Sequence, residues 1–409
     1  MFENDELVER VILFAVDTGN GDDVSASLDE LSELVKTAGA VVVGRLIQNK
    51  EKIESGTYLG TGKLEELRDM VVGLGATGVC SDDELSPVQM KNIELALDTK
   101  VMDRTMVILD IFARRATTKE GKIQVELAQL KYRSSRLTGV GVSLSRLGGG
   151  IGTRGPGETK LEVDRRVIRS RIAQLQKELN DVKQHRETMR KQRMEGTVPI
   201  VSIVGYTNAG KSTLLNTLTD AGVLEEDKLF ATLDPTSRNY KLFNGQEIIL
   251  TDTVGFIRKL PHHLINAFRS TLEEAKYADI ILHVVDISNP YADNHIITVY
   301  ETLKGLGITD KPVITLFNKI DKLEEIPVLK DFKADKVINI SAKKSIGFDE
   351  LGASLAEIIN NKRSYIEKVI PYNDAGVINL IRQKGTLLCE EYREDGIYVK
   401  AYVDKSLNI

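Results

Sequence analysis

A lysine and two hydroxyl residues follow a glycine-bounded loop in a pattern that suits a triphosphate. The apolar run 200–204 precedes the loop and a helical pattern follows it, which is the strand-loop-helix context of G-x-x-x-x-G-K-[ST]. Glycines let backbone N–H groups turn toward phosphate oxygens, and the helix N-terminus adds partial positive charge. The competing interpretation is a strand-to-helix turn without a ligand. The predicted phosphate-binding residues are Gly205, Tyr206, Thr207, Asn208, Ala209, Gly210, Lys211, Ser212 and Thr213.

Two further segments provide groups for Mg²⁺ and the γ-phosphate. Lys211 supplies charge to the β- and γ-phosphates, and Ser212 supplies a hydroxyl for Mg²⁺. The D-x-x-G at residues 252–255 places a carboxylate near the metal and a glycine N–H near the γ-phosphate. A switch loop at 229–236 needs one hydroxyl that closes on Mg²⁺, and we predict Thr232, with Thr236 as the alternative; Ser212 and Thr232 are then the protein's metal ligands. The nucleotide contacts predicted here are Phe230, Ala231, Thr232, Asp252, Thr253, Val254 and Gly255.

The choice of base rests on an N-K-x-D that ends the apolar strand 312–317. Guanine presents two adjacent donors, N1–H and the 2-amino group, and the carboxylate of Asp321 accepts both. Asn318 is expected to brace the loop and contact N7, and the stem of Lys319 to cover the base. An S-A-K after the strand 337–340 offers a backbone N–H to the guanine O6. The predicted base-binding residues are Asn318, Lys319, Asp321, Ser341, Ala342 and Lys343.

The position after D-x-x-G carries Phe256, where small signalling GTPases use Gln to orient the attacking water. A phenyl ring can neither donate nor accept the hydrogen bond that orients this water. We therefore expect unaided hydrolysis to be slow and to depend on a partner surface or on the switch loops. Arg258, His262 and His263 are nearby candidates, although exposed surface residues are the simpler interpretation of each. The catalytic residue is left unassigned.

The whole chain must position these groups, and its composition is that of a globular protein. It has 409 residues, a net charge of −5 and two cysteines, Cys80 and Cys389, which are too few for a disulfide framework and fit a reducing cytosol. No apolar run reaches membrane-spanning length, and the acidic N-terminus is not a targeting signal. Residues 119–196 carry +9 and the remainder −14. This asymmetry favours a local contact with nucleic acid.

Residues 8–115 alternate between strand and helix patterns, which predicts a small α/β domain with a mainly parallel sheet. The pattern comprises strands at 8–16, 41–43 and 76–80, and helices at 28–35, 64–71 and 88–97, the last leading into the stretch 100–106. A G-T-G-K at residues 60–63 enters a helix. It is either a tight structural turn or a second phosphate site, for a nucleotide or for RNA.

Residues 119–196 read as an antiparallel helical arm. Apolar residues at 4-3-4-3 spacing mark one helix up to about 137 and a second from about 158 to 194. The loop between them, 138–157, has eight glycines, two arginines and no acidic residue. It suits a probe that orders against RNA phosphates; the alternative is a flexible linker between solvated helices. The predicted RNA contacts are Arg146, Arg154, Lys160, Arg165 and Arg166.

Taken together, these segments resemble the HflX family of ribosome-associated GTPases over nearly the whole chain. The resemblance lies in G-Y-T-N-A-G-K-S-T, F-A-T-L-D-P-T, D-T-V-G-F, N-K-I-D and S-A-K, and most specifically in G-G-G-I-G-T-R-G-P-G-E-T-K-L-E-x-D-R-R. It implies binding to the large ribosomal subunit, with the arm reaching toward the peptidyl-transferase centre, and splitting or rescue of stalled or hibernating ribosomes. It also implies ATP as a second ligand of the N-terminal domain. Phe256 fits the family.

We therefore predict an α/β protein with four domains: an N-terminal α/β domain (1–118), the arm (119–196), a P-loop GTPase domain (197–363) and a small α/β appendage (364–409). It is expected to be a cytoplasmic monomer that binds GTP or GDP, Mg²⁺ and the large ribosomal subunit with its RNA. One alternative is an ATP-driven remodeller of ribosomal RNA, with the GTPase as its regulator. Another is a metabolic or scaffold protein whose nucleotide is only structural.

Overall fold

The computed structural model describes residues 8–21, 23–145, 156–194, 198–219, 229–230, 233–259, 274–361 and 363–404. The chain forms two compact units. The first comprises residues 1–181 together with 226–234 and 257–270, and the second comprises 182–225, 235–256 and 271–409. The four-domain division stays a prediction. These units nevertheless group two segments of the predicted GTPase domain with the N-terminal residues.

The first unit contains a four-stranded parallel sheet in the order β2-β1-β3-β4, with helices between the strands. The sequence does not predict α4 as a separate element, because the stretch 100–106 holds both the end of a strand and the start of this helix. Asp103 ends the strand and caps α4 by accepting from the Met106 N–H at 2.9 Å. The elements are β1 Arg10–Asp17, α1 Val24–Thr37, β2 Val41–Asn49, α2 Thr61–Leu74, β3 Gly78–Ser81, α3 Pro87–Leu97, β4 Lys100–Asp103 and α4 Arg104–Arg115.

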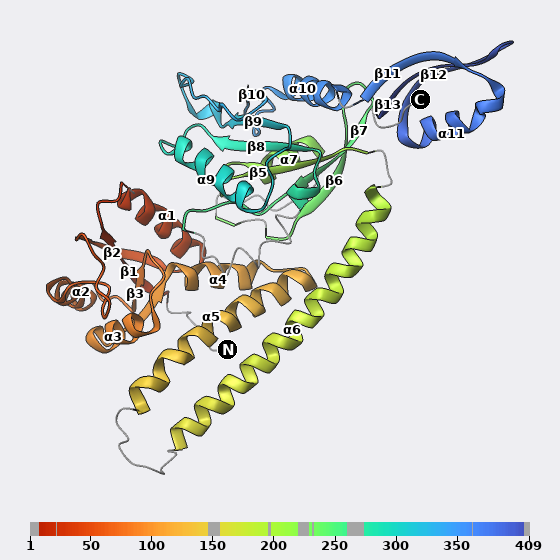
Figure 1. The fold of residues 1–409 in the computed structure, drawn as a ribbon. Helices are drawn as coiled ribbons and strands as arrows, with labels where there is room; N and C mark the ends of the chain where they lie inside the picture. The colour runs from red at the N-terminus through yellow and green to blue at the C-terminus, as the bar shows by residue number, and fades with distance from the viewer. Residues whose placement is uncertain are drawn as a thin grey trace, which may run out of the picture. The chain divides into compact units, whose positions relative to one another are not determined.

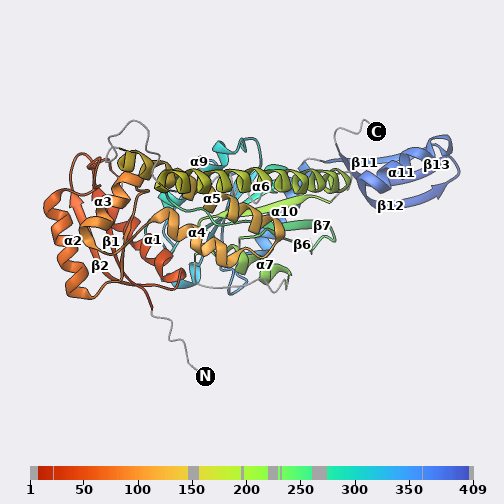
Figure 2. The same cartoon turned by 90° about the horizontal axis from the view of Figure 1, so that it is seen from below.

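Two long helices, α5 (Lys119–Ser145) and α6 (Pro156–Met194), lie side by side in both views, as predicted for the arm (Figures 1 and 2). Their seam is a cluster of buried apolar residues, and Arg171 reaches across it to Glu126 at 2.8 Å. The loop predicted over 138–157 is shorter than expected, because α5 continues to Ser145 and α6 begins at Pro156. Extending a helix is cheaper than nucleating one, and each glycine costs only about 1 kcal/mol. The seam comprises Ile123, Leu127, Leu130, Ile172, Leu175 and Leu179.

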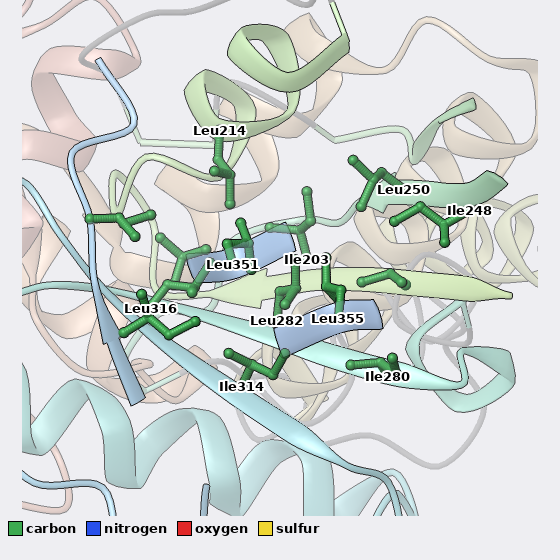
Figure 3. Packing of buried hydrophobic residues seen from close by; sticks show 14 of the residues in the cluster. Ile203, Leu214, Ile248, Leu250, Ile280, Leu282, Ile314, Leu316, Leu351 and Leu355 are labelled. Carbon is green, nitrogen blue, oxygen red and sulfur yellow. The ribbon is translucent and has the colours of Figure 1, made fainter. Parts of the chain in front are cut away.

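The second unit contains a six-stranded sheet in the order β10-β9-β8-β5-β7-β6, in which β6 runs antiparallel to β7 and the other neighbours are parallel. Figure 3 shows its packed side chains. Ile203, Leu282 and Ile314 come from three adjacent strands and pack with Leu351 and Leu355 of α10; all are at most 1% exposed. The elements are β5 Ile200–Gly205, α7 Lys211–Thr219, β6 Thr236–Lys241, β7 Glu247–Asp252, β8 Ile280–Asp286, α9 Ala292–Gly305, β9 Val313–Asn318, η1 Ile320–Lys322, β10 Lys336–Asn339 and α10 Phe348–Asn361.

The C-terminal residues form a three-stranded antiparallel sheet in the order β11-β13-β12, with one helix packed on it (Figure 1). Ile378 and Ile381 of the helix are buried against Val399 and Ala401 of the central strand. This small sheet and helix agree with the predicted appendage. The elements are β11 Arg363–Ile370, η2 Tyr372–Asp374, α11 Ala375–Lys384, β12 Gly385–Arg393 and β13 Gly396–Asp404. Within the described residues, no helix is long and apolar enough to cross a membrane.

Candidate nucleotide-binding site

The predicted phosphate loop joins the end of β5 to the start of α7. Gly205 ends the strand and Lys211 begins the helix, so the loop lies at the carboxyl edge of a parallel sheet, where open α/β sheets bind ligands. Gly210 has φ +97°, and a Cβ there would lie 2.2 Å from the Asn318 Nδ2. That same Nδ2 donates to the Ala209 carbonyl at 2.8 Å. Only glycine fits at position 210, because the loop packs directly on the predicted base-binding segment.

Lys211 is the buried cation of the loop. Its side chain is 6% exposed, and its Nζ donates to the Tyr206 carbonyl at 2.8 Å. Burial lowers the pKa of Lys211 to about 8, opposed by the nearby carboxylate of Asp252 and assisted by the charge of Lys319. Phosphate oxygens would stabilise its ammonium form. The positive charge of Lys211 is therefore only partly balanced by the negative charge of nearby protein groups.

Oxygen ligands suitable for a hard cation meet beside this lysine. The Ser212 hydroxyl donates to the Asp252 Oδ2 at 2.8 Å, and Asp252 is fully buried at the end of β7. Mg²⁺ prefers such oxygens and completes its shell with water and substrate phosphates, so the pair fits the predicted metal. Thr236, the alternative ligand, is the first residue of β6 and pairs with Asp252 across the strands. Thr232 and Ala231 lie outside the described residues.

The predicted base-binding residues converge on the same loop. The Asn318 Oδ1 accepts from the Ala342 N–H at 2.9 Å, so Asn318 links the phosphate loop to the S-A-K segment. Lys319, at φ +67°, donates from its Nζ to the Asn208 carbonyl at 2.7 Å. The expected bracing role of Asn318 agrees with this geometry. The sequence alone did not indicate that Lys319 also contacts the phosphate loop.

The carboxylate predicted to select guanine is itself positioned by a hydroxyl. The Asp321 Oδ1 accepts from the Ser341 Oγ at 2.6 Å, and this hydrogen bond holds the pKa of Asp321 below its ordinary value. Asp286 was missed by the sequence analysis. It ends β8, and its Oδ2 pairs with the Lys319 Nζ at 2.7 Å. The signal was present, because Asp286 is an acidic residue at the carboxyl end of an apolar strand. Lys343 is exposed.

Phe256 is buried, and its backbone joins D-x-x-G to the phosphate loop. Its side chain is 2% exposed. Its backbone N–H donates to the Gly205 carbonyl at 3.1 Å, and its carbonyl accepts from the Thr207 N–H at 2.8 Å. These bonds fasten the end of D-x-x-G to the phosphate loop, and Gly255 lies against Thr207 and Lys211. The ring therefore serves packing, and His262 and His263 lie outside the described residues.

Two segments of the predicted GTPase domain make their contacts within the first unit. Phe230 is 3% exposed and packs edge-to-face on Phe112 of α4, with ring centroids 4.7 Å apart. Its side chain therefore serves packing, and only its backbone stays a predicted nucleotide contact. Asp234 accepts four hydrogen bonds from Thr117 and Thr118. Neither contact was foreseen, because nothing local in the sequence indicates it.

The predicted RNA-binding residues divide by their contacts. Arg165 donates to the Leu137 carbonyl at 2.9 Å, which ties α6 to α5, whereas Arg166 is exposed. Two other arginines of the arm have internal partners. Arg136 pairs with Asp103 at 2.6 Å, and Arg171 pairs with Glu126. Arg146 and Arg154 lie outside the described residues, as does the side chain of Lys160.

The G-T-G-K loop before α2 is mostly committed to the protein itself. The Gly60 N–H donates to the Gln48 Oε1 at 2.9 Å, and the Lys63 Nζ pairs with Glu66 at 2.7 Å. The Gly60 N–H and the Lys63 ammonium therefore have protein partners, whereas no side chain caps the N-terminus of α2. Both interpretations of the loop stay predictions.

Comparison with family models divides the chain into three matched regions. Residues 25–113 match a "GTP-binding GTPase N-terminal" model, and residues 115–193 match a "GTP-binding GTPase Middle Region" model. Residues 200–319 match a model described as "50S ribosome-binding GTPase". The matched regions together extend over most of the sequence.

Individual relatives match the full length. A protein named GTPase HflX from Lacrimispora saccharolytica is 64% identical over 407 residues, which is 100% of this chain and 96% of the relative. Another of the same name, from Caldanaerobacter subterraneus, is 51% identical over 97% of this chain and 91% of its own. Among solved structures, the GDP complex of a protein called SsGBP is 26% identical over 87% of this chain and 99% of its own, with a TM-score of 0.48.

Proposed function

The chain belongs to the GTPase HflX family, and from that premise we propose that it binds the large ribosomal subunit through the α5–α6 arm and splits or rescues stalled or hibernating ribosomes. It is a GTP-hydrolysing enzyme. The setting is the cytoplasm, where ribosomes are, and the acting form is a monomer. The observation that carries the proposal is the guanine-type carboxylate of Asp321, held by Ser341 in a chain that also carries a cationic arm. The next residue, Ala342, is linked to the phosphate loop through Asn318.

Hydrolysis would use this chain's groups for binding and orientation. Lys211 neutralises charge on the β- and γ-phosphates, and the Gly255 N–H meets the γ-phosphate. Ser212, and Thr232 as predicted, would hold Mg²⁺, which would supply positive charge to offset that of the triphosphate. The Phe256 side chain is buried and does not orient water. We therefore propose that a group from the ribosome, or a switch residue ordered by it, completes the site and accelerates the reaction.

The arm supplies the contact with RNA. Arg166 and Arg169 are exposed on α6, one helical turn apart, whereas Arg171 is paired across the seam. Phosphate backbones attract such exposed cations, and each neutralised phosphate releases counterions. The predicted tip residues Arg146 and Arg154 would extend this surface. We expect ribosome association to weaken steeply with salt.

The ATP-driven alternative finds no support in the groups at the carboxyl edge of the N-terminal sheet. Asp82 and Asp83 follow β3, and Asp103 ends β4. The Lys259 Nζ already contacts Asp82 at 2.5 Å and Asp83 at 2.7 Å. Carboxylates repel a triphosphate, and the cations here are engaged by them. We keep GTP as the functional nucleotide, and the experiment below compares it directly with ATP.

Cosedimentation with purified ribosomal subunits tests the proposal. The full-length protein is mixed with large or small subunits in the presence of GDP, ATP or a non-hydrolysable GTP analogue. We expect pelleting with the large subunit, strongest with the GTP analogue, and splitting of added 70S particles by the same complex. Equal pelleting with every nucleotide, or preference for the small subunit, would refute it.

Matched arm variants locate the contact. Replacing Arg166 and Arg169 by Ala, or Arg146 and Arg154 by Ala, should weaken pelleting while leaving GTP binding by the free protein unchanged. Arg171→Ala is the control, because that arginine is engaged by Glu126 within the arm. If the control weakens binding as much as the exposed pairs, the arm acts through its structure and does not contact RNA with these side chains.

A further inference from the structure

The phosphate loop carries one large side chain that its motif does not require. Tyr206 fills the first variable position of G-x-x-x-x-G-K-[ST], and its side chain is 5% exposed. A buried tyrosine ring needs a packing partner, because it covers a large apolar area and presents two flat faces. That partner comes from α9, a helix of the same second unit.

The partner is His295, in the first turn of α9. Its ring is stacked on the ring of Tyr206, with centroids 3.7 Å apart and an angle of 6° between the planes. The next residue, Ile296, is 7% exposed and packs in a cluster with Val285 of β8 and Phe317 of β9. The imidazole is therefore carried by a helix that is packed on the sheet, and it restrains the Tyr206 ring from that side.

The backbone of Tyr206 holds the lysine of the phosphate loop. Its carbonyl accepts from the Lys211 Nζ at 2.8 Å, and Lys211 is itself buried. A ring that is fixed in place restricts the backbone that carries it. The stack with His295 therefore restricts the position of the carbonyl that orients Lys211.

The same backbone is paired with the end of the D-x-x-G segment. The Phe256 N–H donates to the Gly205 carbonyl at 3.1 Å, and the Thr207 N–H donates to the Phe256 carbonyl at 2.8 Å. Tyr206 lies between these two hydrogen bonds and forms a parallel β-bridge with Phe256. A Cβ at Gly255 would lie 2.7 Å from the Thr207 Cγ2, so the glycine is pressed against the loop. Movement of Tyr206 would shift the glycine whose N–H is expected to meet the γ-phosphate.

We propose that His295 is a positioning residue for GTP hydrolysis: through the Tyr206 ring, it holds the phosphate loop and the Gly255 N–H where the γ-phosphate binds. This role rests on the proposed phosphate contact of Gly255 and is independent of ribosome binding. GDP has no γ-phosphate, so it makes no use of the Gly255 N–H. Loss of the stack therefore weakens the binding of GTP more than the binding of GDP.

A purely structural role of His295 predicts a different result. If the imidazole only packed α9 on the sheet, its removal would lower the thermal midpoint and weaken both nucleotides by the same factor. The ratio of the two dissociation constants would then stay at the wild-type value. This ratio separates positioning of the γ-phosphate site from general loosening of the fold.

The test compares variants of the full-length protein. His295→Leu keeps a helix-forming side chain but removes the flat ring, whereas His295→Phe retains a ring that can stack. Ile297→Ala is the control, because this residue lies on the same helix and is 54% exposed. Kd is measured by calorimetry for GDP and for a non-hydrolysable GTP analogue, with Mg²⁺ present, and the thermal midpoint checks folding.

We expect the ratio Kd(GDP)/Kd(analogue) to fall about twofold to tenfold in His295→Leu, the range for one aromatic pair. The single-turnover rate at saturating GTP should fall in the same variant, because the γ-phosphate is held less firmly. His295→Phe and Ile297→Ala should both keep the wild-type ratio. An unchanged ratio in His295→Leu, or an equal loss in His295→Leu and His295→Phe, overturns the proposal.

Substitution of the other ring gives a second result. Tyr206→Leu should lower the ratio at least as much as His295→Leu, and the double variant should lose little more than Tyr206→Leu, because both changes break one contact. Fully additive losses would show that the two residues act separately and overturn the proposal. Ribosomes enter none of these measurements, so a protein that fails to bind the large subunit leaves the result standing. A wild type that binds neither nucleotide refutes the GTP site, and this role with it.

Discussion

The replacement Asp321→Asn tests the choice of base most directly. The carboxylate accepts from Ser341 at one oxygen and would accept N1–H and the 2-amino group of guanine with its remaining lone pairs. An amide in its place offers one acceptor and turns a donor toward the guanine amino group. Two charge-assisted hydrogen bonds are then lost or replaced by a donor–donor contact.

The magnitude follows from the exposure of the site. Hydrogen bonds to charged groups contribute about 1.5–3 kcal/mol each, so two amount to about 3–6 kcal/mol. Asp321 is only partly buried, which favours the lower end. A loss of about 3 kcal/mol corresponds to about a hundredfold weaker GTP binding. Xanthine carries a carbonyl at position 2, so the variant should bind xanthosine triphosphate more tightly than GTP.

The assay is competition against a fluorescent guanine nucleotide, with GTP, xanthosine triphosphate and ATP as competitors. Circular dichroism and the thermal midpoint serve as controls for folding, and Asn244→Asp, on an exposed turn, controls for a change of one charge elsewhere. Unchanged GTP affinity in Asp321→Asn, with no gain for the xanthine nucleotide, would show that another group reads the base.

The other predictions address the charge, stability and positioning of the second unit. Lys211→Ala should abolish triphosphate binding. In the wild type the pKa of Lys211 is about 8, and bound phosphates favour its ammonium form. GTP affinity should therefore be full below pH 8 and fall by up to about tenfold per pH unit above it, as calorimetry at pH 7 and pH 9 will measure. Ser341→Ala should raise the pKa of Asp321 and weaken GTP binding about three- to tenfold, with equal loss for GDP; a selective loss of one nucleotide would contradict the assignment. Asp331→Asn should lower the free energy of unfolding by about 1.5–3 kcal/mol at pH 7 in urea titrations, because the Thr315 and Tyr300 hydroxyls donate to this carboxylate at 2.7 and 2.8 Å. Burial raises the pKa of Asp331, but the nearby His283 ring and the hydrogen bonds from Thr315 and Tyr300 lower it by more. This stabilisation is therefore present above the unfolded-state pKa of about 3.9 and is lost as pH falls toward the folded pKa. An acid dependence that survives in the variant would refute the argument.

Local chemistry made much of the site predictable. The P-loop, D-x-x-G, N-K-x-D and S-A-K each combine a fixed residue type with the end of an apolar strand, and parallel strands bring their carboxyl ends to one edge. Asn318 shows the benefit, because its predicted bracing role corresponds to hydrogen bonds with Ala209 and Ala342. The helical arm was predictable for the same reason, since its apolar seam repeats at helical spacing.

Element boundaries were less well determined. The stretch 100–106 mixes apolar with charged and polar residues and shows no clear period, and Asp103, which caps α4, marks where strand gives way to helix. The helix α5 continues to Ser145 through residues whose glycines predicted a loop. Local preference is weak at such positions, because a neighbouring turn of helix offsets about 1 kcal/mol per glycine.

The sequence by itself predicted which groups would do the chemistry: a lysine, hydroxyls and carboxylates at strand ends, together with a cationic helical pair. Only the tertiary structure decided that Asp234 completes the cap of a helix 116 residues away and that Lys259 lies on carboxylates 176 and 177 residues away. The physical reason is range. A motif is set by backbone geometry over a few residues and can be recognised locally. A contact between residues more than a hundred positions apart depends on how the whole chain folds, and no local sequence pattern indicates it.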